Sequence, residues 1–185
     1  MDITDLQARL AQLDHLLPSQ REWLDRLLFQ LAFNDHQQIS ILGGAGSGKS
    51  TLALAIAELL SGQYNIALLD ASASSASATQ QLMQQWFAQP GDASIPITEQ
   101  IAITEEQLPL AVVIDDAERF PSEFIRQLSS LPSLVLCFST ESFDAAGLTL
   151  TLNRITADDA EQLLRHDALN SIEIAERLAR ADGNM

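Results

Sequence analysis

Lysine is nearly absent from this chain of 185 residues: Lys49 is the only one, and every other fixed cation is an arginine. Cations are scarce altogether, with 10 lysine and arginine residues against 25 acidic residues and a formal net charge of −15. Such a chain repels nucleic-acid backbones and anionic membrane surfaces, so we expect neither as a partner. A second lysine would be needed for an Asn-Lys-x-Asp guanine-recognition segment, so a standard GTPase is excluded.

Cysteine is equally rare, and long hydrophobic runs are missing. Cys137 is the single cysteine, so no internal disulfide can form and a reducing compartment fits. We find no apolar stretch long enough to span a bilayer, and the acidic start of the chain does not resemble a signal peptide. We therefore expect a cytoplasmic protein, or the cytoplasmic part of a longer, membrane-anchored one.

The only lysine lies in a glycine-rich segment that fits the phosphate-binding pattern G-x-x-x-x-G-K-[ST]. Glycines allow the backbone to turn tightly and to point successive N–H groups at one anion, and the following helix adds its dipole. The lysine would follow the β- and γ-phosphates, and the serine after it would offer a hydroxyl to Mg²⁺. The predicted nucleotide-binding residues are Gly43, Gly44, Ala45, Gly46, Ser47, Gly48, Lys49, Ser50 and Thr51.

An acidic pair follows a second hydrophobic run, Val112-Val113-Ile114. This run has the form of a Walker B strand, whose terminal carboxylates emerge beside the phosphate loop. We predict that Asp115 is the partner of Mg²⁺ and that Asp116 polarises an attacking water as a general base. An ordinary turn or helix cap is the alternative for such a pair. The phosphate loop one βα unit earlier favours the nucleotide site.

Hydrophobic runs and helical stripes alternate along the chain, which predicts a parallel sheet covered on both faces. Residues 94–108 fit either a strand or a ragged helix. The serine- and alanine-rich residues 71–79 are expected to form a loop that leads into a helix. The expected strands are 38–42, 65–70, 110–115, 134–138 and 148–152, and the expected helices are 4–16, 23–35, 49–60, 79–87, 121–131, 156–167 and 170–181.

Three segments together, Gly43–Thr51, Val112–Glu118 and Leu134–Thr140, resemble an AAA+ ATPase. More narrowly, they are similar to the ExeA-type ATPases of bacterial secretion and pilus assembly, with DamX-type cell-envelope proteins close behind. The resemblance covers about residues 12–183, although only the two Walker segments are highly specific. It implies an α/β P-loop NTPase fold: a three-layer αβα sandwich with a five-stranded parallel sheet in the order 5-1-4-3-2.

The resemblance also implies how the chain is organised and what it binds. It implies N-terminal helices within a nucleotide-binding domain at 1–155 and the start of a C-terminal helical lid at 156–185. The implied ligands are ATP and Mg²⁺, with Lys49 and Asp116 catalytic and Ser50 and Asp115 on the metal. A sensor residue that reads the γ-phosphate would be Ser139 or Thr140, and the adenine pocket would involve residues 16–20. The implied partners are proteins of an envelope or secretion complex, with ATP-dependent self-association as a further hypothesis.

The chain departs from the family pattern in ways that predict weak hydrolysis. Asp116 stands where AAA+ proteins usually have a glutamate, and a misplaced base can cost about 10²-fold in rate. Residues 128–153 contain no arginine or lysine that could act as an arginine finger, and no arginine matches a sensor-2 position. Two functions therefore stay open: a slow ATPase, and a nucleotide-dependent interaction module with negligible turnover. A small-molecule kinase is less favoured because the arginines are scattered.

Overall fold

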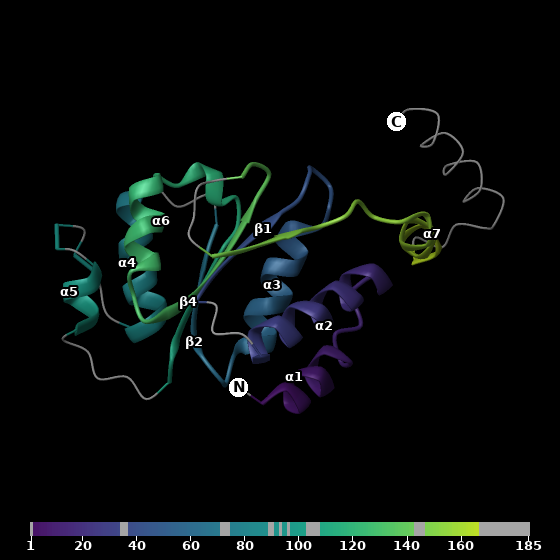
Figure 1. Ribbon diagram of the computed structural model, residues 1–185, viewed down its shortest axis with the longest axis horizontal. Helices are drawn as coiled ribbons and strands as arrows, with labels where there is room; N and C mark the ends of the chain where they lie inside the picture. The colour runs from purple at the N-terminus through teal and green to yellow at the C-terminus, as the bar shows by residue number, and fades with distance from the viewer. Residues whose placement is uncertain are drawn as a thin grey trace.

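The computed structural model describes residues 2–33, 37–70, 75–88, 91–92, 94–95, 97–102, 108–142 and 147–166 (Figure 1). Five strands and a series of helices alternate along these residues, as the sequence pattern predicts. In chain order the elements are α1 Ile3–Leu10, α2 Pro18–Phe33, β1 Gln38–Leu42, α3 Lys49–Leu60, β2 Asn65–Leu69, α4 Ser75–Phe87, α5 Ile97–Ala102, β3 Leu110–Ile114, the 3₁₀ turn η1 Ala117–Arg119, α6 Ser122–Ser129, β4 Ser133–Ser139, β5 Leu148–Thr151 and α7 Ala157–His166.

The five strands form one parallel sheet in the order β2-β3-β4-β1-β5, which confirms the expected 5-1-4-3-2 arrangement. In the register, Leu42 of β1 pairs with Ser139 of β4, and Ile114 of β3 pairs with Cys137 of β4. The phosphate loop after β1 and the acidic pair after β3 therefore emerge at the same edge, on either side of the end of β4.

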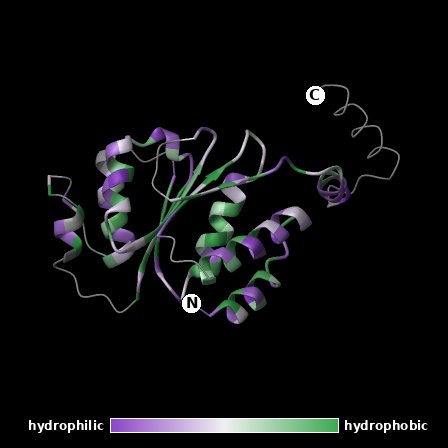
Figure 2. Ribbon diagram, in the orientation of Figure 1, coloured by the Kyte–Doolittle hydropathy of each residue, from purple (hydrophilic) through white to green (hydrophobic). Residues whose placement is uncertain are grey.

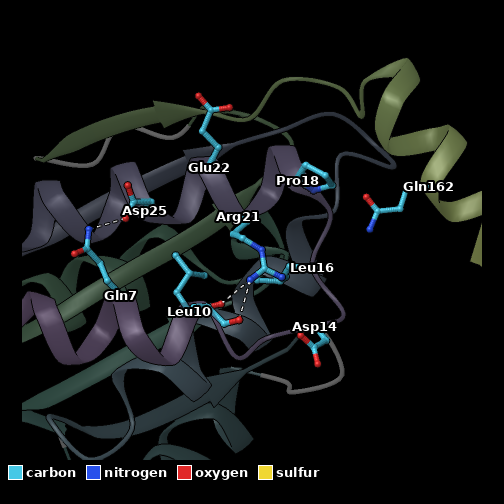
Figure 3. Close-up of a pocket in the computed structure, with 10 residues that line it drawn as sticks. Gln7, Leu10, Asp14, Leu16, Pro18, Arg21, Glu22, Asp25 and Gln162 are labelled. Carbon is cyan, nitrogen blue, oxygen red and sulfur yellow. Dashed lines mark hydrogen bonds between the residues drawn. The ribbon is translucent and has the colours of Figure 1, made fainter.

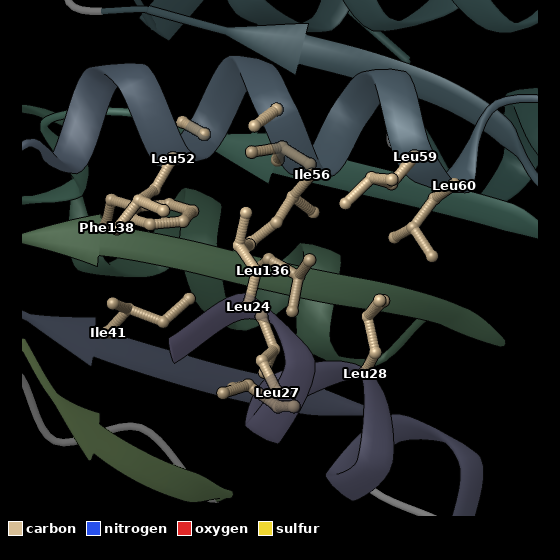
Figure 4. Packing of buried hydrophobic residues seen from close by; sticks show 14 of the residues in the cluster. Leu24, Leu27, Leu28, Ile41, Leu52, Ile56, Leu59, Leu60, Leu136 and Phe138 are labelled. Atoms are coloured by element: carbon tan, nitrogen blue, oxygen red, sulfur yellow. The ribbon is translucent and has the colours of Figure 1, made fainter. Parts of the chain in front are cut away.

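Alternate residues of β2, β3 and β4 enter two separate cores, one on each face of the sheet, whereas β1 and β5 contribute to one of them. On one face, Ile39 and Ile41 of β1 and Leu136 of β4 pack with α1, α2 and α3 (Figure 4). On the other face, Val112 of β3 and Val135 of β4 pack with α4, α5 and α6. Figure 2 shows the strands and α3 as the most hydrophobic part of the fold, between helices of mixed character. The result is the predicted three-layer sandwich.

Cys137 lies on the central strand β4 and is fully buried, in agreement with its interpretation as a small core residue. Burial raises the pKa of its thiol to about 12. Since the thiolate is the reactive form of cysteine, this side chain is chemically quiet and serves packing.

The N-terminal helices differ from the expected ones. α1 ends at Leu10 instead of near residue 16, because the Arg21 guanidinium takes up its terminal carbonyls. Arg21 Nη1 donates to Leu10 O at 3.1 Å (Figure 3). Its Nη2 donates to Leu13 O, just beyond the helix, at 2.8 Å. Pro18 does not merely interrupt the helical pattern; it begins α2, since a proline has no N–H to lose in a first turn.

The remaining differences concern the second half of the chain. α4 begins at Ser75, four residues earlier than predicted, and the ambiguous stretch 94–108 contains the helix α5. α7 confirms the helix predicted over 156–167. The helix predicted over 170–181 lies outside the described residues, as do residues 71–74 of the predicted loop. Over the described part of the chain, no helix has both the length and the hydropathy to cross a membrane.

Candidate nucleotide site

The phosphate loop joins β1 to α3 and uses its glycines where no other residue fits. Gly46 and Gly48 have φ values of 75° and 85°, a region that strains residues with a side chain. A Cβ on Gly48 would also lie 2.3 Å from Gln20 Nε2 of α2. Gln20 is buried and accepts a hydrogen bond from the Leu17 N–H at 3.1 Å, so α2 packs directly on the loop.

Lys49 is the first residue of α3 and is only 8% exposed. Its ammonium donates to the carbonyl oxygens of Gly43 at 2.7 Å and Gly44 at 3.1 Å. The side chain thus curls back over the start of its own loop. An ammonium has three donors, so these two bonds leave one for an anion held by the loop.

Other polar groups of the loop also fit a phosphate ligand. The Ser47 hydroxyl is buried, with no hydrogen-bond partner, and the N-terminus of α3 has no side-chain cap. Buried hydroxyls and the first N–H groups of a helix normally find a partner, and an anion is a suitable one. Ser50 and Thr51 lie exposed on the first turn of α3.

The acidic pair follows β3 at the same sheet edge. The Asp115 N–H still belongs to the sheet and donates to Leu69 O at 2.8 Å. Asp116 has a left-handed backbone, with φ 53° and ψ 49°, and its N–H donates to Asp115 Oδ1 at 3.1 Å. The Asp116 carboxylate lies 3.7 Å from Arg119 Nε, one turn further along. The chain therefore bends sharply at Asp116 and enters η1.

Ser139 and Thr140 are the two sensor candidates at the end of β4, and only the Thr140 hydroxyl donates to a carboxylate. Ser139 is fully buried and its Oγ donates to Glu141 O at 2.7 Å. Thr140 is exposed and donates twice to Glu118 Oε1, from its N–H at 3.2 Å and from Oγ1 at 2.5 Å. The Gly43 N–H donates to Ser139 O at 3.0 Å, which joins this strand end to the phosphate loop.

Glu118 is charged at neutral pH despite partial burial. Burial by itself would raise the pKa of its carboxyl, but the hydrogen bonds from Thr140 and the nearby charge of Lys49 outweigh this, so the pKa is lowered. The sequence pattern places Glu118 only at the end of the Walker B segment and assigns it no role. Its contact with Thr140 cannot be predicted from local spacing, because 22 residues separate the two side chains.

Two cavities flank residues 16–20, where the adenine pocket is expected. The smaller, of about 170 Å³, lies beside the phosphate loop; the larger, of about 540 Å³, is on the outer side of α1 and α2 and includes no loop residue (Figure 3). We take the smaller one as the candidate base pocket, since of these two cavities it is the one lined by a residue of the loop, Ser47. It is lined by Ser19, Gln20, Glu22, Trp23, Arg26, Ser47, Leu52, Leu152, Asn153, Arg154, Ile155 and Thr156.

A buried carboxylate ties α7 to this pocket. Asp159 Oδ1 accepts the Ser19 N–H in the first turn of α2 at 3.2 Å, and Oδ2 accepts the Thr156 N–H at 3.0 Å and Oγ1 at 2.7 Å. Asp159 therefore caps two helix N-termini at once. Burial would raise the pKa of Asp159, but these hydrogen bonds outweigh it and lower the pKa. Sequence reasoning did not single out this residue.

We expect Asp159→Asn to lower the free energy of unfolding at pH 7 by about 1–2 kcal/mol, because an amide cannot accept at both ends. A lowered folded-state pKa gives stability that is complete above the unfolded-state value of about 3.9 and lost as the pH falls through the folded value. Urea unfolding at pH 7 and near pH 3 should therefore show the variant's deficit shrinking in acid. Asp158→Asn, on the exposed side of the same turn, is the control; an equal loss there, or a pH-independent deficit, would contradict the assignment.

The comparisons agree with this fold. The chain resembles the solved structure of Drosophila ORC bound to DNA, with a TM-score of 0.66 and 19% identity over 87% of this chain and 49% of that one. It also resembles Cdc6p from Pyrobaculum aerophilum, with a TM-score of 0.61 and 17% identity over 81% of this chain and 49% of that one. At such identities the likeness shows the fold alone, and the chain spans about half the length of either protein. No curated protein is significantly similar to it.

A family model gives the closer assignment. The model described as AAA domain (dynein-related subfamily) matches residues 38–133. The match runs from β1 through the phosphate loop and the Walker B strand to the start of β4, and it includes more than half of the chain. The chain therefore belongs to the AAA family and carries a nucleotide-binding domain of the ATPase type.

Proposed function

We propose that this domain binds ATP with Mg²⁺ and hydrolyses it slowly. The observation that carries the proposal is the juxtaposition of a curled Lys49 ammonium and an unpartnered, buried Ser47 hydroxyl at the uncapped start of α3. A phosphate site accounts for these features together. The Lys49 ammonium, the Ser47 hydroxyl and the first N–H groups of α3 are all donors, and one bound anion can satisfy them.

The proposed roles follow the chain. Gly43 to Gly48 would surround the phosphates with backbone N–H groups, and Lys49 would donate to them. Mg²⁺, which neutralises charge between the β- and γ-phosphates when bound, would be held by the Ser50 hydroxyl and the Asp115 carboxylate. Among the described residues there is no group of three or more acidic, histidine or cysteine side chains that could by itself hold a metal ion. Two protein ligands suit Mg²⁺, which keeps waters and phosphate oxygens as its other ligands.

We propose slow hydrolysis for two reasons: the nature of Asp116 as the candidate base, and the absence of a candidate arginine finger in residues 128–153. Asp116 is the candidate base from the sequence, but it is one methylene shorter than glutamate. Its carboxylate lies beside the side chain of Arg119, which belongs to the same turn and is 66% exposed. An arginine finger, where one is used, contributes roughly 10³–10⁵ in rate, and residues 128–153 offer no cation for this role.

Calorimetric titration with ATP·Mg²⁺ and a multiple-turnover phosphate-release assay test this proposal. We expect binding that requires Mg²⁺, and phosphate release that is slow but above that of the buffer. Absence of binding would reject the nucleotide site itself. Binding without any release, in the wild type and in Asp116→Asn alike, would favour the second candidate, a nucleotide-dependent interaction module.

The biological setting is a separate proposal, and it rests on the resemblance of the Walker segments to secretion, pilus-assembly and envelope ATPases. We propose a cytoplasmic role in assembling such a complex, with protein partners and with self-association when ATP is bound. The net charge of −15 favours protein over DNA as the partner. Affinity capture with the full-length protein from its host, and light scattering with and without ATP·Mg²⁺, test the two parts.

A further inference from the structure

Two carboxylates, Asp116 and Glu118, follow Asp115 at the end of the Walker B strand, and they have different partners. Asp116 has the left-handed backbone described above, and its carboxylate lies 3.7 Å from Arg119 Nε. The side chains of Arg119 and Asp116 are 66% and 35% exposed. The Asp116 carboxylate therefore has a cation of its own turn as its neighbour.

Glu118 instead has its partner at the end of β4. The bend at Asp116 and the 3₁₀ turn bring η1 against β4, so Glu118 Oε1 reaches both donors of Thr140. β4 lies between β3 and β1, and the Ser139 carbonyl next to Thr140 accepts the first N–H of the phosphate loop. Glu118 therefore lies at the sheet edge between the acidic pair and the loop.

The electrostatic environment agrees with this geometry. The positive charge of Lys49 is among the groups that lower the pKa of Glu118, after the hydrogen bonds from Thr140. Glu118 is also exposed, so water can reach it. Thr140 uses only Oε1, and a carboxylate has further acceptor positions on its second oxygen. A charged, oriented and accessible carboxylate is what a general base requires.

We propose that Glu118, held by Thr140, is the carboxylate that activates water for hydrolysis in this domain, in place of Asp116. The inference rests on the proposed ATPase function. The water oxygen forms a bond to the γ-phosphorus as the bond from that phosphorus to the β–γ bridging oxygen breaks. The bond's electron pair leaves on ADP, and the water proton passes to Glu118 and then to solvent. Thr140 is a positioning residue, since it acts through Glu118.

Single carboxyl-to-amide changes in the full chain separate the two candidates. Glu118→Gln keeps an oxygen for Thr140 but cannot take a proton, so we expect kcat to fall about 100-fold or more. ATP affinity should change by less than about threefold, a small free-energy difference. The fold-reduction in kcat should be at least about ten times smaller in Asp116→Asn than in Glu118→Gln. Glu123→Gln, which removes an exposed carboxylate on α6, is the matched control and should retain full activity.

Thr140→Val gives a second readout that a merely structural role would not move. It removes the Oγ1 hydrogen bond, which helps to lower the pKa of Glu118, so that pKa should rise. Because the base acts only when ionised, the acidic limb of the kcat–pH profile should move to higher pH. If Glu118→Gln fails to fold, the kcat–pH profile of Thr140→Val still tests the role of Glu118.

Three outcomes overturn the inference. One is an active Glu118→Gln beside an inactive Asp116→Asn. The second is an acidic limb that stays in place in Thr140→Val. The third is a wild-type protein that binds ATP but releases no phosphate, which rejects Glu118 as a base and leaves the nucleotide site standing. A wild type that fails to bind ATP in calorimetry would instead reject the proposed function itself, so the two failures are distinguishable.

Discussion

Replacing Lys49 by alanine should weaken ATP·Mg²⁺ binding by about 100-fold or more and leave the fold intact. A hydrogen bond to a charged group contributes about 1.5–3 kcal/mol, and the upper part of this range, for the one bond that the remaining Lys49 donor would make to a phosphate oxygen, corresponds to about that factor. The fold should survive because the Lys49 ammonium bonds only to its own loop, at Gly43 and Gly44, and no hydrophobic core depends on it. Calorimetric titration measures the affinity, and thermal unfolding checks the fold.

Two further variants make that result specific. Arg126→Ala removes an equal charge from the exposed side of α6 and should bind ATP normally, which separates the local role of Lys49 from the net charge. Lys49→Arg keeps the charge but replaces a compact ammonium by a planar fork, so it should restore little of the affinity. Wild-type affinity in Lys49→Ala would remove the phosphate loop from the proposed site.

Replacing Phe138 by alanine should lower the free energy of unfolding by about 3–5 kcal/mol, the usual cost of removing a large aromatic ring from a core. Phe138 lies on the central strand β4, is fully buried and packs toward Leu52 of α3 (Figure 4). The melting temperature should fall by roughly 10 °C, since each kcal/mol corresponds to about 2–4 °C in a domain of this size. Urea and thermal unfolding measure both quantities.

The matched control is Phe33→Ala, which removes the same ring from the exposed end of α2. Phe33 is 65% exposed and its ring lies 4.4 Å from that of Phe29, so its loss should cost less than about 1.5 kcal/mol. Equal losses in the two variants would mean that β4 and α3 do not form the core that anchors the phosphate loop.

The strands and the phosphate loop were predictable because their signals are local. A hydrophobic run such as Leu110–Ile114 indicates a strand wherever it packs, and the G-x-x-x-x-G-K-S pattern defines its own backbone shape. The helix ends were less predictable. α1 stops at Leu10 because Arg21 on the next helix takes its carbonyls, and no pattern within residues 4–16 contains that information.

The candidate site likewise has residues that the sequence predicts and contacts that it does not. The sequence identified Lys49, Ser50, Asp115 and Asp116 as a group, since each follows a recognisable strand or loop. It did not reveal the different partners of Asp116 and Glu118, because these depend on the left-handed backbone at Asp116 and on the position of Thr140. Nor did it reveal that Gln20 packs against Gly48.

Composition and local spacing alone predict a parallel sheet, place the one lysine in a phosphate-loop motif and leave no second lysine for guanine recognition. The contacts around the candidate site depend instead on how distant segments pack. Glu118 meets Thr140 across 22 residues of chain, and Asp159 meets Ser19 across 140. The physical reason is that parallel strands align their carboxyl ends at one edge, so packing rather than spacing selects which polar groups meet there.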